Sequence, residues 1–333
     1  MAAASFRALR VEEGAGGRYQ RSIVTRSVDE LPEADVLIRV RYSALNFKDA
    51  LSATGNKAVT RNFPHTPGID AAGVVEESRS PDWQPGQEVL VTSYDLGMNH
   101  DGGFAEYIRV PADWVVPLPP GLSTREAMIL GTAGFTAALS VQAIVDRGIT
   151  PADGEVLVTG ATGGVGSFAV GILAKAGFRP MAGTGKPDAE DWLRRLGAAG
   201  LVSREDLADD SGKPLLKSRW AGAVDTVGGD VLATTLKCLN YGASVSCCGL
   251  VRSPKLETTV MPFILRGNAL LGVDSQNTPM ELRRRSWERL AGEWKLPDLE
   301  MLVTETSLDG LEEHIQNILK GGVRGRVLVD LEA

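Results

Sequence analysis

Short apolar runs separated by turn residues cover the first 116 residues of the chain. Four of these runs combine β-branched residues with alternating apolar and polar positions, and they span residues 36–42, 73–77, 88–92 and 105–110. Alternation with a period of two is typical of a strand that buries one face. The pattern predicts a compact, mainly antiparallel β domain at the start of the chain.

A cluster of prolines with Gly121 ends this pattern and predicts a domain boundary near Leu122. Ser123 and Glu126 then form an S-x-x-E capping box, the signal that opens a helix. The residues that follow are apolar on several sides as far as Val141. We therefore expect a long helix that is sandwiched between two domains.

The rhythm changes after residue 154, where continuous apolar runs alternate with helical segments. This order is typical of βαβ units, whose parallel strands are buried on both faces. The strand candidates are six runs, at residues 155–159, 179–184, 201–203, 223–227, 244–249 and 270–273. Six such strands predict an α/β fold with a Rossmann-type, doubly wound parallel sheet.

The last part of the chain contains a basic helix over residues 279–294, a second helix over 307–320 and a strand over 326–331. We expect this tail to return to the β domain, which then comprises residues 1–122 and 275–333, with the dinucleotide-binding domain at 123–274. In the basic helix, three arginines at 283–285 lie on a solvated face or contact a phosphate-bearing substrate tail. The expected buried stripe is formed by Leu282, Trp287, Leu290 and Trp294.

Charge and cysteine content narrow the class of protein. The net charge of −7 repels polyanions and argues against nucleic acid as the main partner. No apolar stretch is expected to reach the roughly 18 residues of a membrane span. Residues 1–11 carry no signal-peptide core, so we expect a cytoplasmic protein with no membrane partner. The three cysteines are too few and too badly spaced for a disulfide framework.

The sharpest chemical signal is a glycine loop between the strand at 155–159 and a helix. It reads Gly-Ala-Thr-Gly-Gly-Val-Gly over residues 160–166. Gly163 lets the backbone approach a pyrophosphate, the helix start offers unpaired N–H groups, and Gly166 permits close helix–sheet packing. A purely structural turn is the alternative, because Ala161 stands where the common G-x-G-x-x-G motif has its first glycine.

The end of the second strand of this sheet indicates which dinucleotide binds. An acidic residue there usually binds the ribose hydroxyls of NAD, whereas this chain has Thr184, Gly185 and Lys186. A hydroxyl and an ammonium suit the 2′-phosphate of NADPH. Ser203 and Arg204, after the third strand, supply a second donor pair. The competing interpretation takes Asp188 as the ribose carboxylate, although Asp is also common at a helix N-cap.

Taken together, the β domain, the capped helix, the glycine loop and the returning tail resemble the medium-chain dehydrogenase/reductase superfamily, which combines a GroES-like catalytic domain with a Rossmann domain. Alcohol dehydrogenases of that superfamily hold zinc with Cys residues and a Gly-His-Glu segment. Here Asn46 stands near the first ligand position, Pro67-Gly68-Ile69-Asp70 replaces the Gly-His-Glu segment, and no Cys precedes Cys238. We therefore expect no metal.

A finer resemblance is to the NADPH-dependent acrylyl-CoA reductases, earlier grouped with quinone oxidoreductases. It is carried by many segments in the right order, including Leu45–Ala50, Gly131–Ala137, Asp225–Gly228, Cys248–Leu250, Thr259–Arg266 and Gly272–Ser275. Phe47 stands where Tyr is usual, which preserves stacking capacity.

This resemblance also implies site residues. Asn46 and Asp49 belong to the active site, where Asp49 orients Asn46 or Lys48 or helps proton delivery. The alternative is that they form only a helix start, in which Asp49 pairs with Lys48 or complements the helix dipole. Lys48 and Arg324 are candidates for substrate binding, and Arg326 for a phosphate contact, with ordinary solvated arginines as the alternative. Phe47 is expected near the nicotinamide, and the residues expected to border the cofactor are Thr162, Gly163, Gly164, Val165, Leu250, Ile264 and Ser275.

The implied reaction is the reduction of an α,β-unsaturated thioester, with acrylyl-CoA becoming propionyl-CoA. Hydride adds to Cβ, and the charge that develops on the thioester oxygen requires a donor, for which Asn46 is the candidate. Two alternatives stay open, an NADPH:quinone reductase and a non-catalytic NADPH-binding protein. The superfamily resemblance also implies a homodimer, for which the run at 270–273 is a plausible edge strand.

Overall fold

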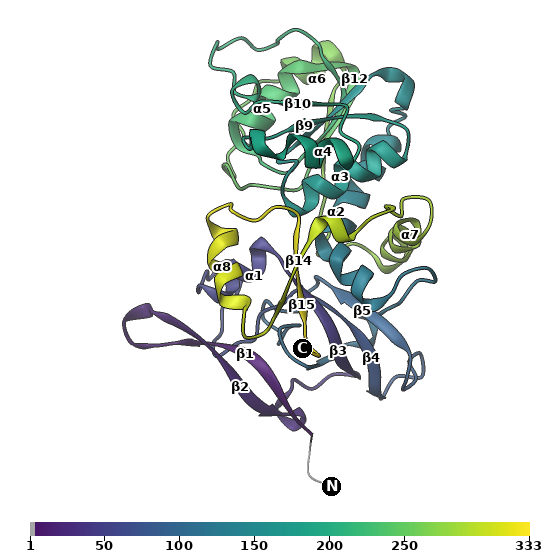
Figure 1. Cartoon of the computed structure of the whole chain (residues 1–333). Coiled ribbons are helices and arrows are strands. Elements are labelled where there is room, and N and C mark those ends of the chain that lie inside the picture. Colours follow the sequence, from purple (N-terminus) through teal and green to yellow (C-terminus); the bar gives the residue numbers. More distant parts are fainter. Residues whose placement is uncertain (1–3) are drawn as a thin grey trace. The chain divides into compact units, whose positions relative to one another are not determined.

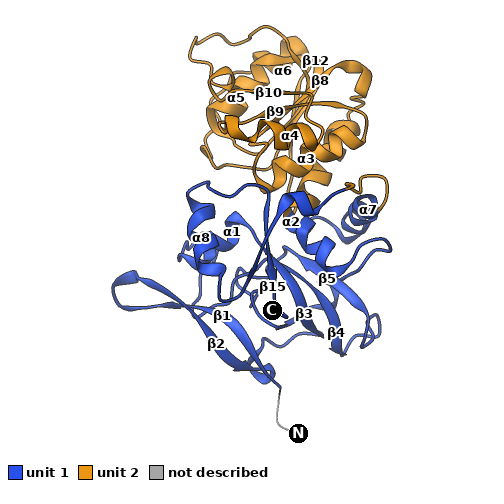
Figure 2. Ribbon diagram, viewed as in Figure 1, with its two compact units in different colours: residues 1–132, 276–291, 298–333 blue, residues 133–275, 292–297 orange. Residues whose placement is uncertain are grey.

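The computed structural model describes residues 4–333 and divides into two compact units. Unit 1 comprises residues 1–132, 276–291 and 298–333, and unit 2 comprises residues 133–275 and 292–297 (Figure 2). The division falls inside helix α2 (Thr124–Val145), ten residues beyond Leu122. The predicted capping box of this helix is present, because the Ser123 N–H donates to Glu126 Oε2 and the Glu126 N–H to Ser123 Oγ.

Unit 1 is built on a seven-stranded sheet with the order β14-β15-β3-β4-β5-β7, in which β6 also pairs with β3. All the pairings are antiparallel except that of β14 with β15. The strands are β3 (Val36–Leu45), β4 (Asp70–Ser78), β5 (Glu88–Thr92), β6 (Tyr107–Val110), β7 (Val116–Pro117), β14 (Val303–Ser307) and β15 (Arg326–Asp330). The expected mainly antiparallel β domain is confirmed.

The last strand of the tail joins this sheet. Strand β15, at the yellow end of the chain, pairs with β3, with Val327 opposite Leu45 (Figure 1). A separate hairpin is formed by β1 (Ser5–Glu13) and β2 (Tyr19–Ser27). The helices of unit 1, besides the start of α2, are α1 (Phe47–Ala53), α7 (Met280–Ala291) and α8 (Leu311–Leu319).

Unit 2 contains the predicted doubly wound sheet. Six parallel strands lie in the order β10-β9-β8-β11-β12-β13, so the order in which strands are added to the sheet reverses between β8 and β11. The strands are β8 (Glu155–Thr159), β9 (Arg179–Gly183), β10 (Gly200–Val202), β11 (Trp220–Asp225), β12 (Leu239–Cys247) and β13 (Ala269–Gly272). The helices are α3 (Gly164–Lys175), α4 (Glu190–Arg195), α5 (Gly229–Cys238) and α6 (Met261–Arg266).

The structure corrects the expected faces of helix α7. Leu282 is 37% exposed, whereas Arg283 is fully buried, so the prediction of a buried Leu282 and a solvated Arg283 was wrong. The Arg283 guanidinium lies 4.2 Å from the centre of the Tyr94 ring and donates to the Thr92 carbonyl over 2.9 Å. Long arginine stems pack well against apolar surroundings, and this head group finds its polar and aromatic partners inside unit 1.

The expectation about apolar length was also wrong. By length and composition α2 is apolar enough to cross a membrane. In this protein 83% of its most apolar window is buried, as in the core helix of a soluble protein. The three cysteines are free thiols, as the spacing predicted.

Candidate active site

Helix α1 begins at a polar cap that brings Asn46 and Asp49 together. The Asn46 backbone is extended, and its N–H donates to Asp49 Oδ2 over 2.7 Å, which is half of a capping box. The other oxygen of Asp49 accepts from the N–H groups of Gly68 and Ile69, at 3.2 and 2.8 Å. Asp49 is fully buried. The helix start thus holds a carboxyl group away from water with several donors around it.

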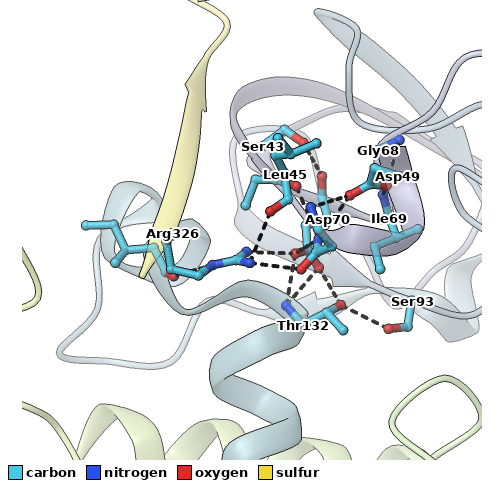
Figure 3. A network of polar contacts seen from close by, with 12 residues as sticks. Ser43, Leu45, Asp49, Gly68, Ile69, Asp70, Ser93, Thr132 and Arg326 are labelled. Atoms are coloured by element: carbon cyan, nitrogen blue, oxygen red, sulfur yellow. Dashed lines mark hydrogen bonds and ion pairs between the residues drawn. The ribbon is translucent and has the colours of Figure 1, made fainter. Parts of the chain in front are cut away.

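The Asn46 side chain joins Asp49 to a second buried carboxyl group, Asp70 at the start of β4. Asn46 Nδ2 lies 3.1 Å from Asp49 Oδ2 and 2.8 Å from Asp70 Oδ2. Asn46 Oδ1 accepts from Arg326 Nη1 over 3.0 Å. Figure 3 shows Asp49, Asp70 and Arg326 pointing toward one another from α1, β4 and β15. The side-chain amide of Asn46 donates to both carboxyl groups. Asn46 therefore fixes the separation of Asp49 and Asp70 and does not present a free donor.

Arg326 is buried with the two carboxyl groups and is only 3% exposed. Its Nε donates to the Ile129 carbonyl over 3.1 Å and its Nη1 to the Leu45 carbonyl over 3.2 Å. Its Nη2 lies 3.5 Å from Asp70 Oδ2. Both sequence interpretations, a phosphate contact and a solvated arginine, require a guanidinium at the surface, and this burial supports neither.

Thr132 and Ser93 extend the network from Asp70. The Thr132 N–H lies 2.9 Å from Asp70 Oδ1, and the Thr132 hydroxyl donates to the same oxygen over 2.6 Å. Ser93 Oγ lies 2.9 Å from Thr132 Oγ1 (Figure 3). An ionised carboxylate only accepts, so the Thr132 oxygen is left to accept from Ser93.

Gly131 interrupts helix α2 next to this network. Its φ of 49° and ψ of −156° are not helical. A Cβ at this position would lie 2.5 Å from Asp70 Oδ2 and 2.8 Å from Arg326 Nη2. Glycine is therefore required both by the backbone conformation and by the close approach of the ion pair.

Burial controls the charges of this network. It raises the pKa of Asp49 to about 7, and the charge of Asp70 adds to the rise, while hydrogen bonds from Asn46 and Ile69 oppose it. Burial also lowers the pKa of Arg326, against the opposing effect of Asp70 and Asp49. Two carboxyl groups therefore share one guanidinium in a place with little solvent.

The other predicted residues of this segment are half-buried. Phe47 is the first residue of α1, and Lys48 Nζ donates to Gln276 Oε1 over 2.8 Å. Asp49 Oδ2 accepts from the Asn46 N–H at the start of α1. Arg324, on the loop before β15, is exposed.

The glycine loop of unit 2 has the predicted strand–loop–helix context. It follows β8 at the reversal point of the sheet and opens α3 with Gly163 as N-cap. A Cβ at Gly163 would contact only the Gly160 carbonyl oxygen, at 3.4 Å, so the loop has open space above it. A Cβ at Gly166 would collide with the Gly160 backbone, which explains the close helix–sheet packing. These features fit a dinucleotide pyrophosphate at the first N–H groups of α3.

The five residues predicted at the 2′-phosphate lie at the ends of β9 and β10. Arg204 lies directly over Gly185, because a Cβ there would come within 2.7 Å of Arg204 Nη2. Thr184 Oγ1 accepts from the Lys186 N–H over 3.0 Å, and Ser203 Oγ accepts from the Asp206 N–H over 3.1 Å. Both hydroxyl hydrogens remain available as donors. A guanidinium, an ammonium and two hydroxyls suit a phosphate group.

The remaining cofactor candidates lie on loops and on α6 of unit 2. Leu250 and Ile264 are 59% and 67% exposed, and Ser275 is half-buried. Asp188, the competing ribose carboxylate, is exposed and lies inside a short 3₁₀ turn (Pro187–Ala189), not at the expected helix N-cap.

Sequence reasoning missed Asp70, Thr132 and Ser93 as members of the buried network. The available signal was Asp70 itself, a charged residue directly before the apolar run of residues 71–75. Within residues 4–333, no group of three or more His, Cys, Asp or Glu side chains has an arrangement that could hold a metal ion.

Two families of known sequences match the chain. Residues 32–120 match the family described as alcohol dehydrogenase GroES-like domain, and residues 164–292 match the family described as zinc-binding dehydrogenase. The first match lies within the β-rich part of unit 1, and the second covers most of the doubly wound sheet.

Similar proteins extend over nearly the whole chain. Acrylyl-CoA reductase AcuI of Ruegeria pomeroyi is 45% identical over 98% of this chain and 100% of that protein. The putative quinone oxidoreductase YhfP of Bacillus subtilis is 46% identical over 98% of this chain and 99% of that protein.

Two solved structures are also similar to this chain over nearly its whole length. Escherichia coli K-12 YhdH with bound NADPH superimposes with a TM-score of 0.94 at 46% identity, covering 98% of this chain and 100% of that one. Bacillus subtilis yhfP with NAD bound superimposes with a TM-score of 0.96 at 46% identity, covering 98% and 99%.

Proposed function

Since this chain belongs to the medium-chain dehydrogenase/reductase family, we propose that it reduces the double bond of a short α,β-unsaturated acyl-CoA with NADPH. Acrylyl-CoA is then converted to propionyl-CoA without zinc. The observation that carries this proposal is the near full-length similarity to proteins named acrylyl-CoA reductase, at 45% and 47% identity. The chain is an oxidoreductase of this family, and the acyl-CoA substrate is the proposed part.

NADPH is the proposed cofactor. The pyrophosphate lies at Thr162, Gly163, Gly164, Val165 and Gly166, where the start of α3 offers N–H donors. Lys186 and Arg204, with the hydroxyls of Thr184 and Ser203, hold the 2′-phosphate. Two similar structures contain NADP and NADPH, which supports this choice, while the NAD in a third makes the 2′-phosphate contacts the point to test.

In this proposal, residues of unit 1 bind the acyl-CoA and position the groups that act on its acyl part. When bound, NADPH supplies hydride to Cβ of that group. Negative charge then develops on the thioester oxygen, and Cα requires a proton. We assign Asn46 the task of holding Asp49 and Asp70 together, in place of the direct donor role first expected from the sequence. Lys48 and Arg324 are the proposed contacts to the CoA part.

Replacing Asn46 by alanine tests this assignment. We expect kcat with acrylyl-CoA to fall by about 100-fold, because the bridge between the two carboxyl groups is lost and acid–base groups contribute effects of that order. The KM for NADPH should change by less than about twofold, since the cofactor segments of unit 2 are untouched. Steady-state kinetics at saturating NADPH gives both numbers.

A matched control for that variant is Asn56→Ala, which removes an exposed amide whose oxygen accepts from the Ala58 N–H just beyond α1. It should retain normal turnover. Full activity of Asn46→Ala, with an unchanged melting temperature, would remove Asn46 from the active site.

Reduction of a quinone is the second candidate, and the name of the Bacillus subtilis relative favours it. The two candidates separate in one assay that follows NADPH oxidation with acrylyl-CoA, crotonyl-CoA and benzoquinone. The proposal requires kcat/KM to be highest for acrylyl-CoA. Preference for benzoquinone would favour the second candidate, and tight NADPH binding without turnover would indicate a non-catalytic binding protein.

We also propose a cytoplasmic homodimer. Strand β13 ends the sheet of unit 2 and pairs only with β12 in the described chain, so its outer edge is open to a second copy. The preceding helix α6 adds the exposed apolar side chains Ile264 and Leu265. Light scattering behind a sizing column should give twice the 35.4 kDa mass of one chain, and the mass of a single chain would contradict the proposal.

A further inference from the structure

A buried carboxyl group of unit 2 lies at the reversal point of the parallel sheet. Asp225 ends β11, Thr159 ends the neighbouring strand β8, and both side chains are fully buried. Asp225 Oδ1 accepts from the Thr159 hydroxyl over 2.7 Å, and its Oδ2 accepts from the Gly228 N–H over 2.8 Å. Gly228 is the N-cap of α5, so the positive end of that helix also faces this carboxylate. These donors offset the unfavourable removal of a charge from water.

Thr159 connects this carboxylate to the start of the glycine loop. An ionised carboxylate only accepts, so the Thr159 hydroxyl donates its hydrogen to Asp225, and its oxygen accepts from the Thr226 N–H over 3.0 Å. The Thr226 hydroxyl in turn donates to the Thr159 carbonyl over 2.9 Å. Gly160, the first residue of the loop, has a φ of 62°, and a Cβ there would collide with Thr226 Oγ1. The glycine loop therefore begins at a fixed separation from the turn that follows β11.

The turn after β11 also packs against the segment that follows β12. The Cys248 N–H donates to the Asp225 carbonyl over 3.0 Å. A Cβ at Gly249 would collide with the Thr226 carbonyl, so the two backbones are in close contact. Asp225 thus lies where three segments meet, at the carboxyl ends of β8, β11 and β12.

These segments lie on both sides of the point where the strand order reverses. A dinucleotide lies across such a point in a doubly wound sheet. Its pyrophosphate is assigned to the glycine loop and its 2′-phosphate to the ends of β9 and β10, so its nicotinamide half extends over the ends of β11 and β12. The separation between the glycine loop and the turn after β11 therefore decides whether one dinucleotide can contact both.

We propose that Asp225 and Thr159 are positioning residues that hold the glycine loop against the turn after β11, so that one dinucleotide binds to both. This inference rests on the proposed function, because it takes the glycine loop as the cofactor site. Both side chains are fully buried, so they act through the backbone segments that they join. A loop that is already held in its bound conformation binds more tightly, because the ligand does not have to order it.

Thr159→Val tests this role, because valine keeps the shape of the side chain but lacks the hydroxyl. We expect the dissociation constants of NADPH and NADH to rise by the same factor, about tenfold or more, since both dinucleotides span the reversal point. Adenosine 2′-phosphate reaches only the ends of β9 and β10, so its dissociation constant should change by less than about twofold. Thr159→Ser restores the hydroxyl and should bind all three ligands as the wild type does. Fluorescence of the reduced cofactors and calorimetry with the fragment give these values without any acyl-CoA.

A second variant tests whether the two residues act as a unit. Asp225→Asn leaves a single acceptor for the Thr159 hydroxyl and the Gly228 N–H, so it should weaken NADPH and NADH equally as well. Combining Thr159→Val with Asp225→Asn should raise the dissociation constants by less than the product of the two single effects, because both changes disrupt the same contact. Single effects that multiply in full would contradict the proposed coupling.

The matched control is Thr235→Val, which removes another buried hydroxyl of unit 2, one that donates to the Val231 carbonyl within α5 over 2.8 Å. It should bind all three ligands normally. Unchanged dinucleotide binding by Thr159→Val would overturn the proposal, and so would an equal loss of adenosine 2′-phosphate binding, which indicates a general structural role. A wild-type protein that binds neither NADPH nor NADH would instead refute the proposed function, and this inference with it.

Discussion

Replacing Arg326 by methionine is expected to lower the free energy of unfolding by about 3–5 kcal/mol, the usual result of leaving buried charge without its partner. Arg326 is the cation that faces Asp49 and Asp70, and it also donates to the carbonyls of Leu45 and Ile129. Methionine fills similar volume but leaves these groups without a donor. Urea denaturation at neutral pH measures the loss.

The free energy of unfolding of the Arg326→Met variant should depend on pH. Without the guanidinium, Asp49 loses a charge that favours its ionised form, so its pKa in the folded variant should rise above the value of about 7 that it has in the wild type. Above about pH 7 the folded variant then binds more protons than the folded wild type, so its relative stability rises as pH falls toward 7. The deficit against wild type should therefore shrink as pH falls to about 7 and stay nearly constant below that value.

Two further variants make this test specific. Arg79→Met breaks an exposed ion pair with Glu33, and it should cost less than about 1 kcal/mol. Adding Asp70→Asn to Arg326→Met should recover part of the lost free energy of unfolding, because the double variant no longer contains one of the uncompensated buried charges. An Arg326→Met protein no less stable than Arg79→Met would show that the buried network is not held by this cation.

Replacing Lys186 by aspartate should reverse the preference for the cofactor. A charge-assisted hydrogen bond contributes about 1.5–3 kcal/mol, and the new carboxylate repels the 2′-phosphate, so kcat/KM for NADPH should fall by about 100-fold or more. The value for NADH should change by less than about threefold, because NADH carries no phosphate at that position. Steady-state kinetics and the fluorescence of bound reduced cofactor provide independent measurements.

Lys213→Asp is the control for charge, because Lys213 is an exposed lysine of unit 2 in the segment between β10 and β11 and was not predicted to contact the cofactor. It makes the same change in net charge and should leave both cofactors equally well used. If Lys186→Asp weakens NADPH and NADH to the same extent, Lys186 does not contact the 2′-phosphate.

The parallel sheet was predictable from the sequence because its strands are buried on both faces and read as continuous apolar runs. The predicted bounds of β8 match the structure, and the six predicted runs correspond to the six strands of the sheet. The hairpin of β1 and β2 was not delimited, because β2 has no fully buried residue and so lacks a clear apolar face. Strand β14, of sequence VTETS, has no buried residue at all.

The candidate site was predictable only in its local parts. The glycine loop and the Asn46–Asp49 cap are contacts between residues close in sequence, which motifs describe. The contact of Arg326 with Asp70 joins residues 256 positions apart, and no periodicity reports on such a pair. The burial of Arg283 was not predicted for a related reason, since a charged residue is expected to be solvated unless its buried partners are known.

The break in helix α2 at Gly131 has a consequence for how this sequence can diverge. Any larger residue there would have to force the chain into a rarely allowed conformation and push against Asp70 and Arg326 at the same moment. Neither the unfavourable backbone conformation nor the steric clash is tolerable while Asp70 and Arg326 remain in place. The glycine and the ion pair should therefore be inherited together and lost together.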